Sequence, residues 1–470
     1  MSFKCALHNS ALFKIAQTIR VARGVFLFTF LMGSQLGWSS PNLARFVSGQ
    51  SGVVDLDSQQ VSWCAGLPSL GSVCGAGLGL CSLALLGSRN SIILVLGLMT
   101  AKWIMWLFAD SAAHVYLFQW ICGLSNIMGM NLFSLYLGDV SPADLRGTII
   151  SVCLNGHSVG LLVATLVETH LERRHSVPLY LLLTSTAIGL FLWVRDSPYH
   201  LIKRGRRREA ELAIAAYFPR CDPVDKYAEI SDYVTRSQSS ATSSLKSLAV
   251  ELKDGVVRRG MLVVFLVFAI PQLSGYLVMI FYAEQIFSKS ASADLMAPRL
   301  FVNCMFAASC LATCCCVKLI DHIGRRKLFV VSSLGTCLSL SGLAAHFHLL
   351  ERDDAIDSEV ASYLRYLPIV CMPLYMAFSS VGYLSVPAAT LSELVPANLR
   401  SVAVCLSCLS MAVPGFCVTK LYQPACDYLG EAWPFWIYAA FTLTALPVSL
   451  LLLPETKGKS LLEIQNDLQN

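Results

Sequence analysis

Residues 137–147 read LGDVSPADLRG, and residues 391–401 read LSELVPANLRS, so the same pattern occurs twice, 254 positions apart. In each copy an acid, Asp139 or Glu393, is followed three residues later by a proline and seven residues later by an arginine. Each copy also comes directly after a long apolar run. Self-similarity over this distance predicts two related structural halves, and in a membrane protein such halves usually have a path between them.

The composition around these motifs is that of a membrane protein. The 470 residues are 55% hydrophobic and 14% charged, against about 25% charged in soluble domains, and the mean hydropathy is +0.60. A membrane-spanning helix needs about 20 mainly apolar residues. Twelve runs meet this need, over residues 22–40, 61–84, 91–109, 114–137, 148–168, 178–194, 260–287, 299–320, 328–349, 364–391, 401–424 and 433–453. They lack the alternation that marks the strands of a transmembrane barrel.

These runs predict an all-α membrane protein with twelve transmembrane helices in two six-helix bundles. We expect an amino-terminal arm and first bundle over residues 1–194, a cytosolic linker with short helices over 195–259, a second bundle over 260–453 and a cytosolic tail over 454–470. The first apolar stretch begins near Gly24, has no small-residue cleavage site and continues as a span, so we expect no cleavable secretory signal.

Lysine and arginine gather on one side of the predicted spans, and this asymmetry predicts the orientation of the chain. The side that holds both termini carries Arg20, Arg23, Arg89, Arg146, the basic run at 204–208, Arg325, Arg326, Lys327, Arg400, Lys457 and Lys459. We therefore expect a multi-pass protein with both termini in the cytosol. The net charge of +5 reflects this asymmetry, so the expected partner is the lipid bilayer rather than nucleic acid.

The sequence contains no pattern typical of catalysis or of a bound cofactor. Most of the 18 cysteines lie inside apolar runs, where a free cysteine behaves as a small hydrophobe. Cys405 and Cys408 form a C-x-x-C pair, but within a span and without a second pair or a histidine cluster. Phosphate-binding loops, nucleophile elbows and H-E-x-x-H sequences are missing. We therefore expect no enzyme activity, no metal and no cofactor, and nothing in the sequence requires more than a monomer.

Several strings in a fixed order give the chain a resemblance to a known family. They are GWSSPNL at 37–43, SWCAGLP at 62–68, RDSPYHLIKRGR at 195–206, DHIGRRK at 321–327, VTK at 418–420 and LPETKGKSLLEI at 453–464, together with the two repeated motifs. With them the chain resembles the sugar porters of the major facilitator superfamily, most of all the facilitated trehalose transporters of insects. The resemblance covers nearly the whole length. It implies two bundles that rock around a central site, and the plasma membrane as the default compartment.

The resemblance also implies charged gating residues at the cytosolic mouth, where salt bridges join the two bundles. They are Asp139, Arg146, Asp196, Asp321, Arg325, Arg326, Glu393, Arg400 and Glu455. The alternative is that these charges only fix topology and loop structure. We favour gating, because an orientation signal does not need acids at a fixed spacing from arginines. The first half of the pattern is incomplete, since Ala84 stands where the family has an acid, and Ser88 and Gln119 replace arginines.

The sugar site of the family is altered as well. Each sugar hydroxyl needs a polar partner, because desolvating it without one costs roughly 1–3 kcal/mol. The family carries glutamine, asparagine or tryptophan at several positions of this site where this chain has another residue. These positions are Leu154, Pro271, Leu277, Ser309, Ala388, Met411 and Ala412. The polar residues left within the spans, which we predict to bind substrate, are Gln35, Asn155, His157, Gln272, Ser274 and Ser309. For Asn155 and His157 an interhelical hydrogen bond is an equally good explanation, and Gln35 is equally well explained as a packed amide.

Together these features predict a facilitative, uniport transporter of a sugar or related small solute by alternating access. Movement down a gradient is expected because residues 24–40, GVFLFTFLMGSQLGWSS, lack the acid that proton-coupled relatives carry in span one. For Lys102, in span three, we expect outward snorkelling toward Asp110 rather than ligand binding. The alternative function is a non-transporting membrane sensor or inactive relative. It would explain the altered site but not the nearly complete set of gating charges in the second half.

Overall fold

The chain is helical throughout its regular structure in the computed structural model, which describes residues 22–49, 54–141, 146–218, 222–241, 255–351, 363–383, 385–394 and 400–455. The first half holds a helix over residues 22–37, then α2 (Ser39–Val47), α3 (Ser58–Leu86), α4 (Ser88–Leu107), α5 (Ala112–Val140), α6 (Arg146–His170) and α7 (Arg173–Trp193). Three shorter helices follow, α8 (Pro198–Lys203), α9 (Arg207–Tyr217) and α10 (Pro223–Ala241).

The second half has the same kind of long helices, several of them interrupted. They are α12 (Gly255–Leu273), α13 (Tyr276–Phe281), α14 (Ala283–Ser288), α15 (Pro298–Ile323), α16 (Arg325–Leu350), α18 (Leu367–Phe378), the π-helical turn η2 (Ser379–Tyr383), α19 (Ser385–Leu394), α20 (Arg400–Leu429), α21 (Ala432–Leu443), α22 (Ala445–Pro447) and the π-helical turn η4 (Val448–Leu452). Eleven helices of the described residues are long and apolar enough to cross a membrane, and the helix over residues 22–37 precedes them as the twelfth span. The predicted all-α membrane fold is confirmed.

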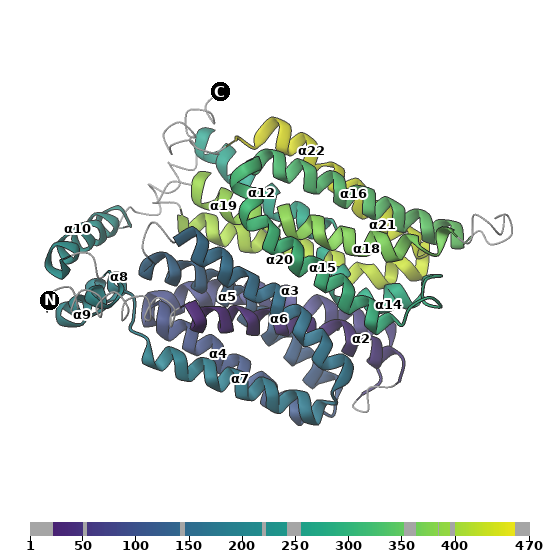
Figure 1. Ribbon diagram of the computed structural model, residues 1–470, viewed down its shortest axis with the longest axis horizontal. Helices are drawn as coiled ribbons and strands as arrows, with labels where there is room; N and C mark the ends of the chain where they lie inside the picture. The colour runs from purple at the N-terminus through teal and green to yellow at the C-terminus, as the bar shows by residue number, and fades with distance from the viewer. Residues whose placement is uncertain are drawn as a thin grey trace, which may run out of the picture.

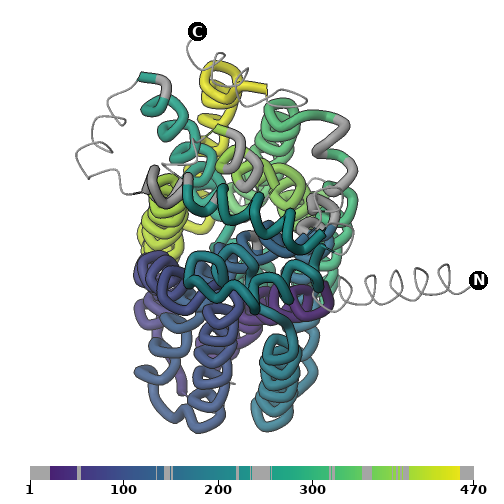
Figure 2. The backbone as a smooth tube through the Cα atoms, turned by 90° about the vertical axis from the view of Figure 1, so that its left-hand side faces the viewer, coloured from purple at the N-terminus to yellow at the C-terminus, as the bar shows by residue number. Residues whose placement is uncertain are grey.

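The helices form two bundles that lie side by side. Figure 1 shows the first half, purple to blue, along one side of the molecule and the second half, green to yellow, along the other. The helices α8, α9 and α10 project from one end of the bundles, which we call the linker end, and Figure 2 looks onto this end. At the opposite end, the far end, α2 packs against α14.

The two halves repeat the same turn at the linker end. Gly87 joins α3 to α4 and Gly324 joins α15 to α16, with φ angles of 85° and 91°. Glycine adopts such positive φ angles without the steric cost that a side chain brings. The repeat in the sequence is therefore accompanied by a repeat in the structure.

Helices of the first bundle approach until their backbones touch. A Cβ added to Gly33 would lie 1.8 Å from the main-chain oxygen of His157, and one added to Gly160 would lie 1.9 Å from that of Phe30. Small residues permit such close approach between membrane helices, where van der Waals packing drives association. The glycines thus fix how the helix over residues 22–37 lies on α6.

The apolar core is continuous at the far end and divided at the linker end. One cluster of buried side chains joins Trp38 and Phe46 of the first half to Tyr282, Phe287 and Tyr422 of the second. Toward the linker end, the large buried clusters of the described residues belong to one half each. The two bundles are therefore packed together most tightly at the far end.

Span seven is broken in the middle, and the break positions the candidate site. The helix α12 ends at Leu273, and α13 begins only after Gly275, which has a φ of 83°. The ring of Tyr438 lies so close to Gly275 that an added Cβ would be 2.6 Å from it. A side chain at position 275 would therefore be both strained and in collision.

Candidate functional site

The far end is closed by polar contacts between the bundles. Lys420 Nζ on α20 donates to Ser62 Oγ on α3 at 2.6 Å, and the ammonium lies 4.3 Å from the centre of the Trp63 ring. The main-chain N–H of Glu284 donates to Ser40 Oγ at 3.1 Å. Together with the shared apolar core, these contacts shut the far end of any path between the bundles.

Near the middle of the spans, α6 and α15 bring polar groups of the two bundles together. Cys314 Sγ lies 3.3 Å from Asn155 Oδ1, and Ser158 Oγ lies 3.2 Å from Thr313 Oγ1. His157 is buried on the same helix, and no hydrogen bond of its imidazole is seen among the described residues. Asn155 thus makes an interhelical contact, while His157 keeps both ring nitrogens available.

Gln272 and Ser69 mark the strongest candidate for a ligand-binding point. Both side chains are buried, and neither Gln272 Oε1 nor Ser69 Oγ has a hydrogen-bond partner. They come from different bundles, yet both lie next to Gly415, at 3.5 Å and 3.1 Å from the position of an added Cβ. Buried polar atoms are almost always paired, so unpaired atoms from two bundles at one point indicate a place for a polar ligand.

Sequence reasoning selected Gln272 but not Ser69. Serine is frequent in these spans and is usually satisfied by a main-chain oxygen of its own helix, as Ser82 Oγ is by Gly79 at 2.9 Å. Only the structure shows that Ser69 lacks such a partner and lies beside the second bundle.

Ser274 and Ser309 are placed in contacts within the second bundle. Ser274 Oγ donates to the main-chain oxygen of Pro271 at 2.7 Å, and Tyr375 Oη donates to the main-chain oxygen of Ser274 at 3.0 Å. Ser309 Oγ lies 2.6 Å from Ser380 Oγ, where η2 passes α15. These contacts hold the broken spans seven and ten in place.

Gln35 lies in the core of the first bundle, where Lys102 is its partner. Lys102 Nζ donates to Gln35 Oε1 at 2.5 Å, and Ser125 Oγ donates to the same oxygen at 2.8 Å. The lysine is fully buried, so the expectation that it snorkels outward is wrong. Its ammonium lies 4.7 Å and 4.6 Å from the ring centres of Trp103 and Phe118, which supply the attraction that water would give at the surface.

Among the predicted gating residues, Asp196 and Glu455 play matching roles in their own halves. Asp196 Oδ1 accepts from the main-chain N–H of Arg89 at 3.4 Å, and Glu455 Oε1 accepts from that of Arg325 at 3.1 Å. Each contact ties the segment after the last span of a half to the turn between its second and third spans. In this conformation both acids therefore contact residues of their own bundle.

Two further gating residues reach across their own half in a similar way. Arg326 donates to the main-chain oxygen of Leu450, and Asp139 Oδ2 accepts from Ser197 Oγ at 2.6 Å. The side chains of Arg146, Asp321, Glu393 and Arg400 lie outside the described residues, so their gating role remains a prediction.

Gln119, which stands where the family has an arginine, forms a neutral contact. Gln119 Nε2 on α5 donates to Ser39 Oγ on α2 at 3.3 Å. In the described residues no cluster of three or more His, Cys, Asp or Glu side chains could hold a metal ion. Near the middle of the spans, the groups that meet between the bundles are the amide of Asn155, the thiol of Cys314 and the hydroxyls of Ser158 and Thr313, which suit a neutral polar ligand.

Comparison with known proteins agrees with this geometry. The chain is 26% identical over 93% of its length to a facilitated trehalose transporter of Bombyx mori, of which it covers 85%. It is 24% identical over 95% of its length to one of Drosophila willistoni, of which it spans only 50%.

Solved structures share the fold. The xylose transporter XylE of E. coli in a partially occluded inward-open conformation matches with a TM-score of 0.75 at 16% identity, over 95% of this chain and 100% of that one. The inward-open form of the same transporter gives a TM-score of 0.72 at 18% identity, over 95% and 99%. The profile of the family described as "Sugar (and other) transporter" matches residues 22–468, and the chain therefore belongs to that family, as the sequence predicted.

Proposed function

We propose that the chain is a facilitative transporter of a sugar or related polar solute, which works by alternating access without chemical conversion of the solute. The observation that carries the proposal is the pair of buried, unpaired atoms Gln272 Oε1 and Ser69 Oγ, from different bundles and next to Gly415. A sugar hydroxyl can both donate and accept, so it can pair with both groups. Each unpaired group costs roughly 1–3 kcal/mol, and a bound solute recovers this cost.

The proposed solute is a sugar because the relatives are named as trehalose transporters and the site offers neutral polar groups. Gln272 and Ser69 supply an amide and a hydroxyl where the bundles meet, and Asn155 supplies a second amide at the contact between α6 and α15. Leu277 and Pro271 stand where the family has polar residues, so fewer hydroxyls of the solute are bound. This composition supports weak binding of a sugar or binding of a less polar relative of one.

Movement down a gradient, without proton coupling, is supported by two features. Residues 24–40 contain no acid, and Gln119 forms a neutral contact with Ser39. A proton-coupled cycle needs a group at the site that takes up and releases a proton during the cycle. His157 remains as a titratable side chain within span five, and a transport rate that is independent of an imposed proton gradient is the expected result.

We propose further that the linker end faces the cytosol and that the protein works as a monomer in the plasma membrane. The excess of Lys and Arg at the linker end supports this orientation. With the far end closed, the conformation described above is then inward-facing. The gating role of Asp139, Arg146, Asp321, Glu393 and Arg400 belongs to the same proposal, with these charges pairing when the linker end closes.

Uptake by cells that express the protein tests the proposal. The panel contains radiolabelled trehalose, glucose, fructose, a polyol and several less polar solutes, and surface delivery is checked by biotinylation. We compare the parent with Gln272→Ala and Ser69→Ala, and with Ser82→Ala as a matched control on the same helix as Ser69. Saturable sugar uptake should fall about tenfold in each site variant and stay unchanged in the control.

The other outcomes are equally informative. Normal uptake by Gln272→Ala and Ser69→Ala would show that the solute does not bind next to Gly415. If only a less polar solute were taken up, the protein would still be a transporter, but its solute would not be a sugar. No uptake by protein at the surface, with a ligand-dependent change in cysteine labelling, would favour the membrane sensor.

A further inference from the structure

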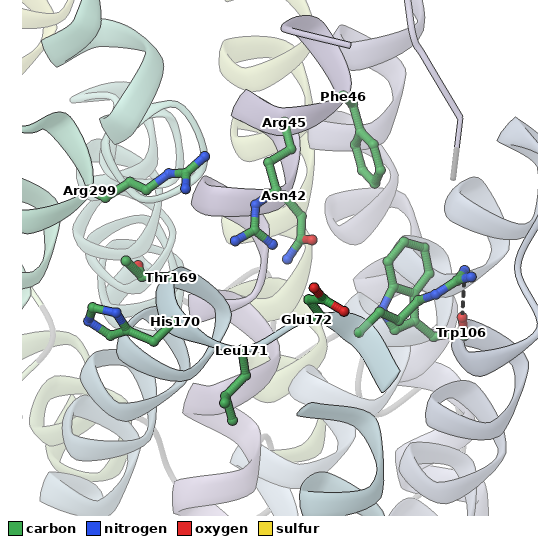
Figure 3. A pocket seen from close by; sticks show the side chains of 10 residues that line it. Asn42, Arg45, Phe46, Trp106, Thr169, His170, Leu171, Glu172 and Arg299 are labelled. Atoms are coloured by element: carbon green, nitrogen blue, oxygen red, sulfur yellow. Dashed lines mark hydrogen bonds between the residues drawn. The ribbon is translucent and has the colours of Figure 1, made fainter. Parts of the chain in front are cut away.

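A polar pocket of about 330 Å³ lies at the far end, where the two bundles meet (Figure 3). Its walls include Arg45 on α2, Trp106 on α4, Glu172 and Arg173 at the start of α7, and Arg299 on α15. Gln272 and Ser69 do not line it. The pocket is therefore separate from the candidate solute site, and it contains side chains of both bundles.

Only part of the charge in this pocket is neutralised. Arg299 Nε forms an ion pair with Glu284 Oε1 at 3.2 Å. Glu172 is the acid that lines the pocket, and its carboxylate is paired at 2.8 Å with Arg174, whose side chain does not line it. Both acids are thus already engaged by arginines.

The other two arginines of the pocket have no ion pair with an acid in the described part of the chain. Arg45 Nη2 donates to the main-chain oxygen of Glu168 at 2.5 Å, and Arg173 Nη1 donates to that of Ala109 at 2.6 Å. The carboxylate of Glu168 lies behind Arg45 and accepts from Asn42 at 2.9 Å. Carbonyl oxygens satisfy hydrogen bonds but carry no net charge. Arg45, Arg173, Arg174 and Arg299 therefore face the three acids Glu168, Glu172 and Glu284, which leaves a net positive charge around the pocket.

Two further observations indicate a ligand. In Figure 3, Arg299 extends into the pocket from one side and Arg45 from another, so like charges of the two bundles share one space. Burial, and then the charge of Arg299, lower the pKa of Arg45, and the carboxylates of Glu168 and Glu284 oppose this only in part. Trp106 is 2% exposed, and its Nε1 is a buried donor without a partner in a wall of this pocket.

We propose that this pocket binds a small oxyanion, a carboxylate or phosphate group, held by Arg45 and Arg173 with Trp106 Nε1 as a further donor. Guanidinium groups bind such oxyanions through paired N–H donors, and an anion removes the repulsion between Arg45 and Arg299. Because Arg299 belongs to the second bundle, the pocket is complete only while the far end is closed. Anion binding therefore favours the closed far end, and this consequence rests on the proposed alternating access.

The oxyanion has two sources at a membrane boundary, a free anion in solution or the phosphate of a lipid headgroup. The first arm of the test uses the full chain, purified in a polyoxyethylene ether detergent that contains neither sugar nor phosphate. Inorganic phosphate is titrated and binding is followed by calorimetry. Saturable binding is expected in the parent, weakened about tenfold to a hundredfold by Arg45→Gln or Arg173→Gln.

Arg365→Gln is the matched control, since it removes an exposed arginine of the far end whose side chain does not line the pocket. Binding to this variant should equal that of the parent. If Arg45→Gln does not purify as a single species, Arg45→Lys is used in its place. Lysine lacks the planar guanidinium with its paired N–H donors, so binding should still weaken. Equal binding by the parent and all variants would overturn the proposal.

The second arm uses vesicles of phosphatidylcholine with and without phosphatidylglycerol, followed by mass spectrometry of retained lipid. Retention of phosphatidylglycerol that is lost in Arg45→Gln but kept in Arg365→Gln identifies the headgroup as the source. Failure of both arms, with neither phosphate nor lipid bound, overturns the site. Binding of phosphate by a protein without uptake would leave this site standing and remove only the transport function.

Discussion

Lys102 Nζ donates to Gln35 Oε1 at 2.5 Å in the core of the first bundle, and no acid in the described residues forms an ion pair with the lysine. A buried ammonium is costly, and here an amide oxygen and two aromatic faces are its partners. The pair fixes span one against span three close to the turn at Trp38.

Removal of the two partners should have opposite effects on stability. Lys102→Met leaves Gln35 Oε1 paired with Ser125 and removes a buried charge, so the free energy of unfolding should stay unchanged or rise by about 1 kcal/mol. Gln35→Leu leaves the ammonium without its acceptor and should cost about 3 kcal/mol. Thermal unfolding of the purified variants measures both. Equal destabilisation by the two changes would show that the charge itself stabilises the bundle.

The contact between Gly33 and His157 predicts a sharp difference between two glycine variants. Gly33→Ala forces the backbones of two spans apart and should destabilise the first bundle by about 3 kcal/mol. Gly77→Ala is the control, because an added Cβ there meets nothing within 4 Å, and it should be neutral or slightly stabilising. The yield and melting temperature of each variant in detergent decide the matter. A stable Gly33→Ala protein would contradict the close packing of these helices.

Lys420 should hold the far end shut. Lys420→Met removes its hydrogen bond to Ser62 and its contact with Trp63, together worth about 1 kcal/mol, so the equilibrium should shift about fivefold toward an open far end. Cys64 is buried at the far end and serves as a native reporter. Its labelling by a membrane-impermeant maleimide, resolved by mass spectrometry, should be faster in the variant. Lys289→Met, which removes a contact within the second bundle, should label like the parent.

Tyr217 attaches the linker helices to the first bundle. Its hydroxyl donates to the main-chain oxygen of Arg195 at 2.6 Å, and burial raises its pKa from 10.0 to about 12. The folded state thus favours the neutral phenol, so its contribution is complete below pH 10.0 and is lost as the pH rises toward 12. Limited proteolysis of the linker should accelerate over this range, and Tyr217→Phe should show faster cleavage already at neutral pH. Tyr428→Phe, at an exposed position, is the control and should change neither the rate of cleavage at neutral pH nor its rise at high pH.

The acid-to-arginine motifs should set the balance between the two open forms. Glu393→Gln or Arg400→Gln removes a charge that the closed linker end needs, so the far end should close more of the time and Cys64 should label more slowly. The charge-swapped double variant, Glu393→Arg with Arg400→Glu, should restore part of the parent's labelling rate. Variants that insert normally and label like the parent would assign these charges to topology alone.

Much of the fold was predictable because its signals are local. The apolar runs predicted the spans. The motif from Asp139 to Arg146, which recurs from Glu393 to Arg400, predicted the two halves. Hydropathy indicates that burying a charge costs free energy, but it does not show which partner stabilises the buried charge. The prediction for Lys102 was wrong for that reason. Its partner depends on how two helices are rotated about their axes, which no short sequence window encodes.

The candidate site was less predictable for a related reason. Gln272 is a rare residue type in these spans and could be selected, whereas Ser69 is one of many serines. Other buried serines also lack a partner, and only the position of Ser69 beside Gly415 of the second bundle distinguishes it. The pocket at the far end needs Arg45 and Arg299, which are far apart in the chain and meet only when the bundles are in contact. Such sites depend on tertiary packing, so composition and motif spacing do not reveal them.

The break at Gly275 gives span seven an elbow. The part beyond it, from Tyr276 to Ser288, is a lever of roughly 20 Å at the rise of a helix, and it ends among the residues that close the far end. A small rotation about one glycine is therefore magnified into a displacement of several ångströms at the tip, while α12 stays in place. The mechanical work of opening one end can thus be concentrated in a single backbone joint instead of being spread over a whole bundle.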